Sequence, residues 1–187
     1  TIHGMNMLIF FILFFEMAVL YFAGPVLLNS RLPAPKVGWT AFALMVVGTL
    51  LVEWTMFTGQ ADVLFTSYVP LRAHPAFYGG VILFAVGALT VVSLFFTTLA
   101  VAKREQTYEG SIPLVTFGAM TAAIIAVFTI ASGAIILVPT WLWSLGLIGS
   151  IDPVMYKLVW WAMGHSSQQI NVSAHVAVWY AIGAMVL

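Results

Sequence analysis

Five long stretches of apolar residues run along the chain, separated by short polar connections. A helix needs about 20 apolar residues to cross about 30 Å of hydrocarbon, and each of the five stretches is long enough. Because a backbone inside hydrocarbon must satisfy its own amide groups, we expect every stretch to be an α-helix. The pattern predicts an all-α integral membrane protein, a single membrane domain (1–187) whose five transmembrane helices cover about 2–28, 37–59, 76–102, 113–137 and 153–187.

The connections between these stretches differ in charge. The connection at 29–36 carries two basic side chains beside two prolines, and the connection at 103–111 begins with two more basic side chains. The two alternate connections carry a single lysine or arginine, Arg72. Because basic residues concentrate in cytoplasmic loops, we expect the two basic connections to face the cytoplasm and Thr1 to lie on the outer side.

Composition excludes several classes of protein. Of the 187 residues 63% are hydrophobic and 6% are charged, with a mean hydropathy of +1.08, which is incompatible with a soluble domain. The formal net charge of zero argues against a nucleic-acid partner. The chain has no cysteine, so a metal would rest on histidine, methionine or oxygen ligands, of which histidine is the first candidate. Apolar sequence is already under way at Thr1 and continues to Leu187, from which we expect a fragment of a longer protein.

A polar run interrupts the fifth stretch, where Gly164 and His165 are followed by polar residues through Asn171. His165 lies roughly 20 Å along the helix from Asp152, where burying an unpartnered imidazole costs several kcal/mol. We therefore favour metal ligation, because an ionisable side chain at membrane depth indicates a functional site. At 3.6 residues per turn Gln169 shares a face with His165, and Gly164 is expected to leave room for a large planar group.

A similar histidine–glycine pair, His3 and Gly4, opens the first stretch. Two interpretations are open for His3. It is either an interfacial histidine that hydrogen-bonds a neighbour, or an axial ligand of a haem iron beside which Gly4 leaves room for the porphyrin.

The remaining polar groups in or near the spans have alternative interpretations. His74 lies in a connection and is expected to be structural, whereas His175 is either a proton-relay group or a packed side chain. Tyr180 is either a proton carrier or an interfacial tyrosine. Glu16 and Glu53 are expected to be protonated or partnered, either as proton carriers or as carboxylic acids bonded to a helix neighbour.

Short motifs spread over essentially the whole chain resemble the catalytic subunit of haem-copper respiratory reductases, the cytochrome oxidase subunit I family, and its B-type branch in particular. The resemblance implies a larger bundle, of which this chain covers about helices two to six. The motifs are Thr1-Ile2-His3-Gly4, Tyr68-Val69-Pro70-Leu71, His74 to Tyr78, Ile112-Pro113-Leu114-Val115-Thr116, Asp152-Pro153 and Trp160-Trp161 to Gly164-His165.

The resemblance implies roles for both histidine–glycine pairs. His3 falls on an axial ligand of the low-spin haem iron, and His165 falls on one of three histidines that bind copper beside the high-spin haem. The other ligands of these groups lie outside this sequence. The chain alone is therefore expected to be inactive.

The sequence departs from the family after His165. Oxygen reductases have a tyrosine four residues after the copper ligand, which supplies an electron and a proton for O–O cleavage, whereas this chain has Gln169, and Ser166 replaces the family's proline. The side-chain amide of glutamine cannot be oxidised and cannot release a proton, so it cannot replace that tyrosine. Nitric-oxide reductases of the same superfamily also lack this tyrosine, so Gln169 favours reduction of NO. Tyr180 falls on a tyrosine of the B-type proton-uptake path, and Val176 falls on another tyrosine of that path.

The resemblance thus implies an oxidoreductase that passes electrons through low-spin haem to a haem/copper centre and reduces NO to N₂O. The implied partners are membrane lipid, other subunits of a respiratory complex, and cytochrome c, a cupredoxin or quinol as electron donor. The implied location is the cytoplasmic membrane of a bacterium or archaeon. Two alternatives stay open: a terminal cytochrome or quinol oxidase that reduces O₂ to water, and a non-enzymatic membrane bundle in which the histidines only hydrogen-bond.

Overall fold

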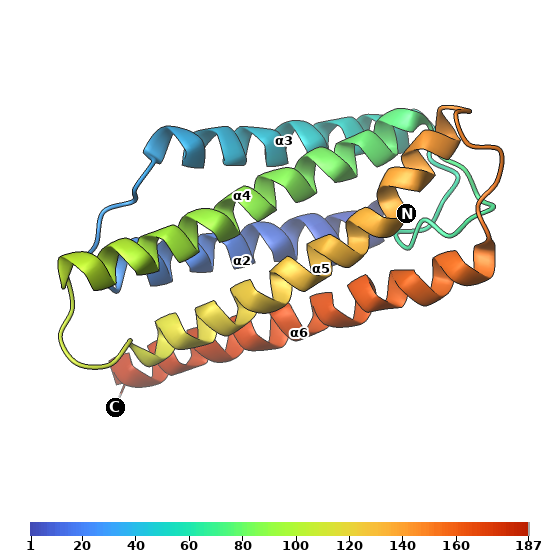
Figure 1. Cartoon of the computed structure of the whole chain (residues 1–187). Coiled ribbons are helices and arrows are strands. Elements are labelled where there is room, and N and C mark those ends of the chain that lie inside the picture. The colour runs from blue at the N-terminus through green and yellow to red at the C-terminus, as the bar shows by residue number, and fades with distance from the viewer. Residues whose placement is uncertain (187) are drawn as a thin grey trace.

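The computed structural model describes residues 1–186, which form helices joined by turns (Figure 1). The first four elements follow one another without a break, so the described part of the chain contains five helices, as the hydropathy pattern predicted. The elements are α1 (Ile2–Met5), η1 (Asn6–Phe11), α2 (Ile12–Tyr21), η2 (Phe22–Val26), α3 (Pro35–Phe57), α4 (Pro75–Glu105), α5 (Leu114–Ser144) and α6 (Pro153–Val186).

Four of these helices are long and apolar enough to cross a membrane, namely Ile2–Val26, Pro35–Phe57, Pro75–Glu105 and Leu114–Ser144. The fifth, α6, has 34 residues and is about 50 Å long, but it contains the polar run around His165 and is less apolar than the others.

The helix α5 extends past the expected end at Leu137 to Ser144, through Pro139. Proline removes one backbone donor from a helix, here the donor that would bond the carbonyl oxygen of Ile135. Thr140 Oγ1 donates to the neighbouring Ile136 carbonyl oxygen at 2.6 Å, a group that also accepts the helical bond of its own backbone nitrogen. Membrane helices tolerate proline, and this helix continues for five residues beyond it.

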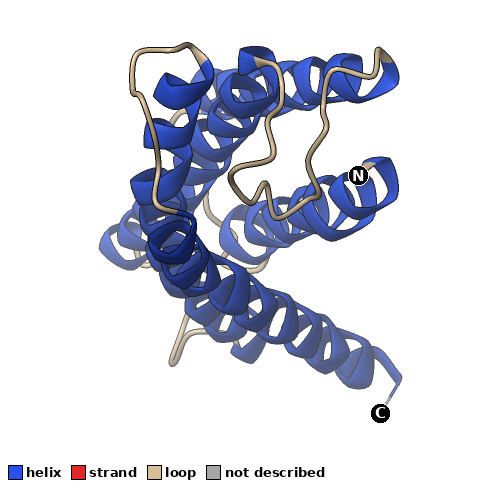
Figure 2. Cartoon of the chain, turned by 90° about the vertical axis from the view of Figure 1, so that its right-hand side faces the viewer, coloured by secondary structure: helices blue, strands red, loops and turns tan. Residues whose placement is uncertain are grey.

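The helices form two antiparallel pairs, α3 with α4 and α5 with α6, and the helix formed by α1 to η2 packs against α4, α5 and α6 (Figures 1 and 2). The N-terminus lies at one end of the bundle and the C-terminus at the other (Figure 1). The two basic connections lie together at the C-terminal end, where Arg31 Nη2 is 2.9 Å from Glu105 Oε1. This hydrogen bond raises the pKa of the Arg31 guanidinium above its usual value.

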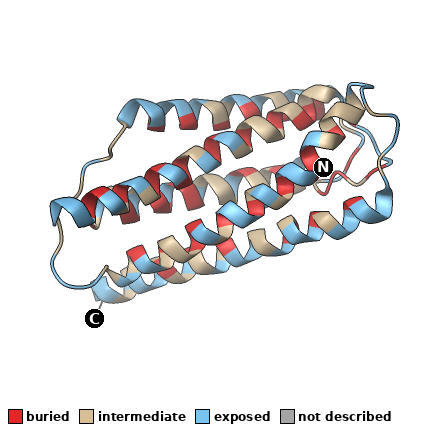
Figure 3. Ribbon diagram, in the orientation of Figure 1, coloured by how far each residue is buried: buried red, intermediate tan, exposed pale blue. Residues whose placement is uncertain are grey.

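Buried residues lie along the sides where the helices meet, and exposed residues lie on the outside of the bundle (Figure 3). Many of the exposed side chains are large and apolar, such as Trp39 (72% exposed), Phe57 (72%) and Phe128 (67%). Such an apolar exterior is what lipid or further membrane helices cover.

Glycines bring the α3 and α4 backbones into close contact. A Cβ added to Gly48 of α3 would lie 2.5 Å from the Gly80 carbonyl oxygen and 2.7 Å from the Phe84 nitrogen of α4. Small residues at helix crossings are typical of membrane bundles.

Replacing Gly48 with alanine is therefore expected to destabilise the protein by about 1–3 kcal/mol, because backbone atoms of α4 must move to admit the methyl group. The measurement is the midpoint of thermal unfolding of the purified full-length protein in detergent. Gly183→Ala on α6 is the matched control, since nothing lies within 4 Å of the added Cβ. An unchanged midpoint in Gly48→Ala would contradict the close approach of the two helices.

Candidate functional site

The site residue His165 is positioned by the way α6 begins and packs. Asp152 caps the helix, with its Oδ1 accepting hydrogen bonds from the backbone nitrogens of Val154 (2.8 Å) and Met155 (3.4 Å). One side of α6 is buried against the bundle through Tyr156, Trp160, Gly164, Ile170, Ala174 and Ala177. The opposite side is exposed and carries His165 with Gln168 and Gln169.

A hydroxyl pair between α5 and α6 sets the rotation of this part of α6. Thr129 Oγ1 of α5 donates to Ser166 Oγ at 2.8 Å, and Ser166 Oγ donates to the Ala162 carbonyl oxygen at 2.6 Å. Because neighbouring helix residues are about 100° apart, Ser166 facing α5 turns His165 away from it. This pair could not be predicted from the sequence, since nothing in a single sequence links a threonine and a serine 37 positions apart.

The His165 imidazole, which is expected at membrane depth, lies on a face of α6 that no described element covers. The side chain is exposed, and it makes no hydrogen bond to any residue in 1–186. Packing against the other helices decides which face of α6 is covered, and a single sequence does not reveal that packing. Both imidazole nitrogens are therefore accessible.

The expected space beside the two glycines is also absent. The indole ring of Trp160, one turn earlier on α6, occupies the position that a Cβ of Gly164 would take. At Gly4 an added Cβ would lie 3.1 Å from Cδ1 of Phe65. Each glycine does admit a planar group, but that group is an aromatic side chain of the protein itself.

His3 lies in the first turn of the bundle's first helix and is exposed. The Thr1 hydroxyl donates to the Val63 carbonyl oxygen and so joins this end of the chain to the connection between α3 and α4. No residue in the described range accepts or donates a hydrogen bond to the His3 ring. The described residues therefore offer no hydrogen-bond partner for the His3 ring, and they do not support its interpretation as a histidine bonded to a neighbour.

The donor chemistry of the two histidines fits haem iron and copper, but their number does not complete either ligand set. Among residues 1–186, no three histidine, aspartate or glutamate side chains lie close enough together to hold a metal ion. His3 and His165 can each contribute one imidazole nitrogen. The remaining ligands would have to come from outside the described residues.

The other two histidines have structural contacts. His74 Nδ1 accepts a hydrogen bond from the Ala76 nitrogen at 3.2 Å and thereby caps α4, which confirms its predicted structural role. His175 donates through Nδ1 to the Asn171 carbonyl oxygen at 2.7 Å, and its ring lies 5.5 Å from that of Phe15 on α2. These contacts favour the packing interpretation of His175.

The tyrosine and the two carboxyl groups lie in different surroundings. Tyr180 is 53% exposed, toward the C-terminal end of α6. Neither carboxyl oxygen of Glu16 or of Glu53 has a hydrogen-bond partner among the described residues. The interpretation of these groups as carboxylic acids bonded to a helix neighbour is therefore not supported.

Most of the chain is similar in sequence and in fold to known proteins. Residues 1–186 match the sequence model of the family described as cytochrome c and quinol oxidase polypeptide I. The chain is 27% identical to cytochrome c oxidase subunit 1 of Thermus thermophilus over 172 aligned residues. The aligned region covers 88% of this chain and 29% of that protein. A cryo-EM structure of a heme-copper terminal oxidase dimer matches with a TM-score of 0.88 and 31% identity, over 95% of this chain and 30% of that one. The chain thus spans less than a third of the length of these relatives.

Proposed function

This chain belongs to the cytochrome c and quinol oxidase polypeptide I family, and on that premise we propose that it is part of the catalytic subunit of a membrane-bound haem-copper reductase that converts NO to N₂O. His3 is the proposed axial ligand of a low-spin haem, and His165 is a proposed ligand of copper beside a high-spin haem. When bound, these groups transfer electrons to the substrate. Cytochrome c, a cupredoxin or quinol is the proposed electron donor.

The observation that carries this proposal is the pairing of His165 with Gln169 on the exposed face of α6. The two side chains are one helical turn apart, so the amide lies next to whatever the imidazole binds. A glutamine amide can donate and accept hydrogen bonds, but it cannot release a proton or an electron. It can therefore orient a bound molecule, but it cannot supply the electron and the proton that O–O cleavage takes from a tyrosine.

Tyr180 has a proposed part in proton uptake. It lies fifteen residues after His165, toward the end of the bundle that carries the basic connections. Basic connections mark the cytoplasmic side in the proposed orientation, in which the protein lies in the cytoplasmic membrane of a bacterium or archaeon. The Tyr180 hydroxyl is thus at the side from which protons are drawn, while Val176, one turn earlier, cannot carry them.

Reduction of O₂ to water is the second candidate function. The observation that favours it is that the two similar proteins are named a cytochrome c oxidase and a heme-copper terminal oxidase. Under this alternative, a group other than residue 169 supplies the electron and the proton that the tyrosine of oxygen reductases provides.

Turnover of the purified full-length protein separates the two functions. With a reduced donor and NO as the only acceptor, we expect N₂O to form at a steady rate, and we expect slower consumption of O₂ under the same conditions. Inert NO together with rapid O₂ consumption would reverse the assignment. Absence of haem absorbance from the pure protein would instead favour the non-enzymatic bundle.

A further inference from the structure

Glu16 is a carboxyl group buried in the middle of the first helix. It lies on α2, thirteen residues after His3, and only 2% of its surface is exposed. Both carboxyl oxygens are fully covered and lack a hydrogen-bond partner in the part of the chain that the structure describes. The mechanism proposed above does not use this group.

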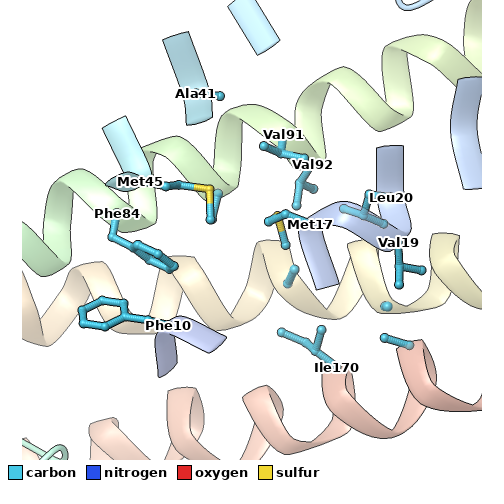
Figure 4. Close-up of a cluster of buried hydrophobic side chains, with 14 of the residues drawn as sticks. Phe10, Met17, Val19, Leu20, Ala41, Met45, Phe84, Val91, Val92 and Ile170 are labelled. Carbon is cyan, nitrogen blue, oxygen red and sulfur yellow. The ribbon is translucent and has the colours of Figure 1, made fainter. Parts of the chain in front are cut away.

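The carboxyl group adjoins a small cavity between three helices. The cavity walls are Met17 and Leu20 of α2, Ala122, Ala123 and Ala126 of α5, and Ile170 of α6. Figure 4 shows Met17, Leu20 and Ile170 within this part of the core. The three small side chains of α5 leave a cavity of about 10 Å³, which is close to the minimum volume that one buried water requires.

The surroundings decide the charge of Glu16. All six lysine and arginine side chains are exposed, so none is buried beside the carboxyl group. An ionised carboxylate without a partner costs far more in an apolar interior than a neutral acid does. The stable form of Glu16 in this cavity is therefore the protonated one.

We propose that Glu16 is a protonated carboxylic acid that binds one water molecule between α2, α5 and α6, and so forms a proton-holding site inside the membrane span. A buried water needs at least two polar partners. The hydroxyl group of the acid can donate to the water, and the carbonyl oxygen of the same acid can accept from it. One carboxyl group thus supplies both partners in an otherwise apolar cavity.

Two hydroxyl groups lie further along the interface between α5 and α6. Ala126 and Thr129 are one turn apart on α5, and Ile170 and Ser166 are one turn apart on α6. Thr129 and Ser166 form the hydroxyl pair described above, beside His165. If the proposed function holds, two residues of the cavity wall lie one helical turn from these hydroxyl groups, and Ser166 directly follows the proposed copper ligand in the chain. The site itself does not depend on which substrate is reduced.

Infrared spectra of the purified full-length protein test the proposal. The spectrum should contain the carbonyl stretch of a protonated carboxylic acid, which Glu16→Gln removes. The same substitution should change a water O–H stretch that is identified by its shift in water labelled with the heavy oxygen isotope. Glu53→Gln is the matched control, because Glu53 is a second unpartnered carboxyl group of the spans, and the band lost in Glu16→Gln should persist in it.

A cavity-filling variant tests the water separately. Ala126→Val places two methyl groups toward the cavity, so the acid should remain protonated while its carbonyl stretch moves to higher frequency as the water's hydrogen bond is lost. The protonated site would be overturned if Glu16→Gln left the carbonyl stretch of the protonated acid unchanged. It would also be overturned if the substitution removed the bands of an ionised carboxylate instead. A carbonyl stretch that does not move in Ala126→Val would overturn the bound water. Optical spectra of haem and copper test the proposed function independently of these bands.

Discussion

Replacing His165 with alanine in the full-length protein is expected to remove copper and to lower the rate of NO reduction at least about 100-fold, because changes merely adjacent to metal ligands already cost about 10–100-fold in affinity or activity. The exposed imidazole has no hydrogen-bond partner in residues 1–186, so its loss leaves no structural bond broken within this bundle. The effect should therefore appear in the metal content and not in stability. The measurements are copper per protein by elemental analysis and the rate of N₂O formation.

The matched control for this variant is Gln168→Ala. Gln168 is exposed on the same part of α6, three residues beyond His165, and it is not assigned a ligand role. This variant should keep its copper and most of its activity, and its thermal midpoint should equal that of His165→Ala. Full copper content in His165→Ala would show that His165 is not a ligand.

The second large effect is expected from His3→Ala, which should lose the absorbance of the low-spin haem while copper stays bound. His3 lies at the end of the bundle and makes no hydrogen bond within the described residues, so the substitution removes a ligand without unfolding the helix. Electrons would then no longer reach the haem/copper centre, and turnover with the physiological donor should stop. The reduced-minus-oxidised optical spectrum and the copper content give the two readouts.

His74→Asn serves as the matched control for His3→Ala. His74 lies at the same end of the bundle, but its Nδ1 caps α4 through the Ala76 nitrogen. Asparagine is also a good helix cap, so this variant should fold normally and keep the complete haem spectrum. A low-spin spectrum that survives in His3→Ala would exclude His3 as an axial ligand.

Sequence reasoning was reliable where the signal was a sum over many residues. The five helices follow from twenty-residue averages of hydropathy, which one polar residue or one proline hardly changes. It was less reliable at single positions. The helix α5 was predicted to end at Leu137, just before Pro139, but it continues through this proline to Ser144.

The candidate site shows the same limit. The histidine–glycine pairs and the one-turn spacing of His165 and Gln169 were visible in the sequence, since both depend only on local order and helix geometry. The space beside Gly164 was not, because it depends on which rotamer Trp160 adopts in the folded bundle.

The sequence by itself determined that the chain is a helical membrane bundle, how many helices it has and roughly which residues they span, and which side chains carry its candidate chemistry. Only the tertiary structure decided that His165 lies on an uncovered face, that Ser166 faces Thr129, and that Glu16 meets a cavity in the core. The physical reason is that hydropathy and helix periodicity act along one chain segment. Burial, hydrogen bonding and cavity space arise between segments that are far apart in sequence, and they are set by how helices rotate against one another.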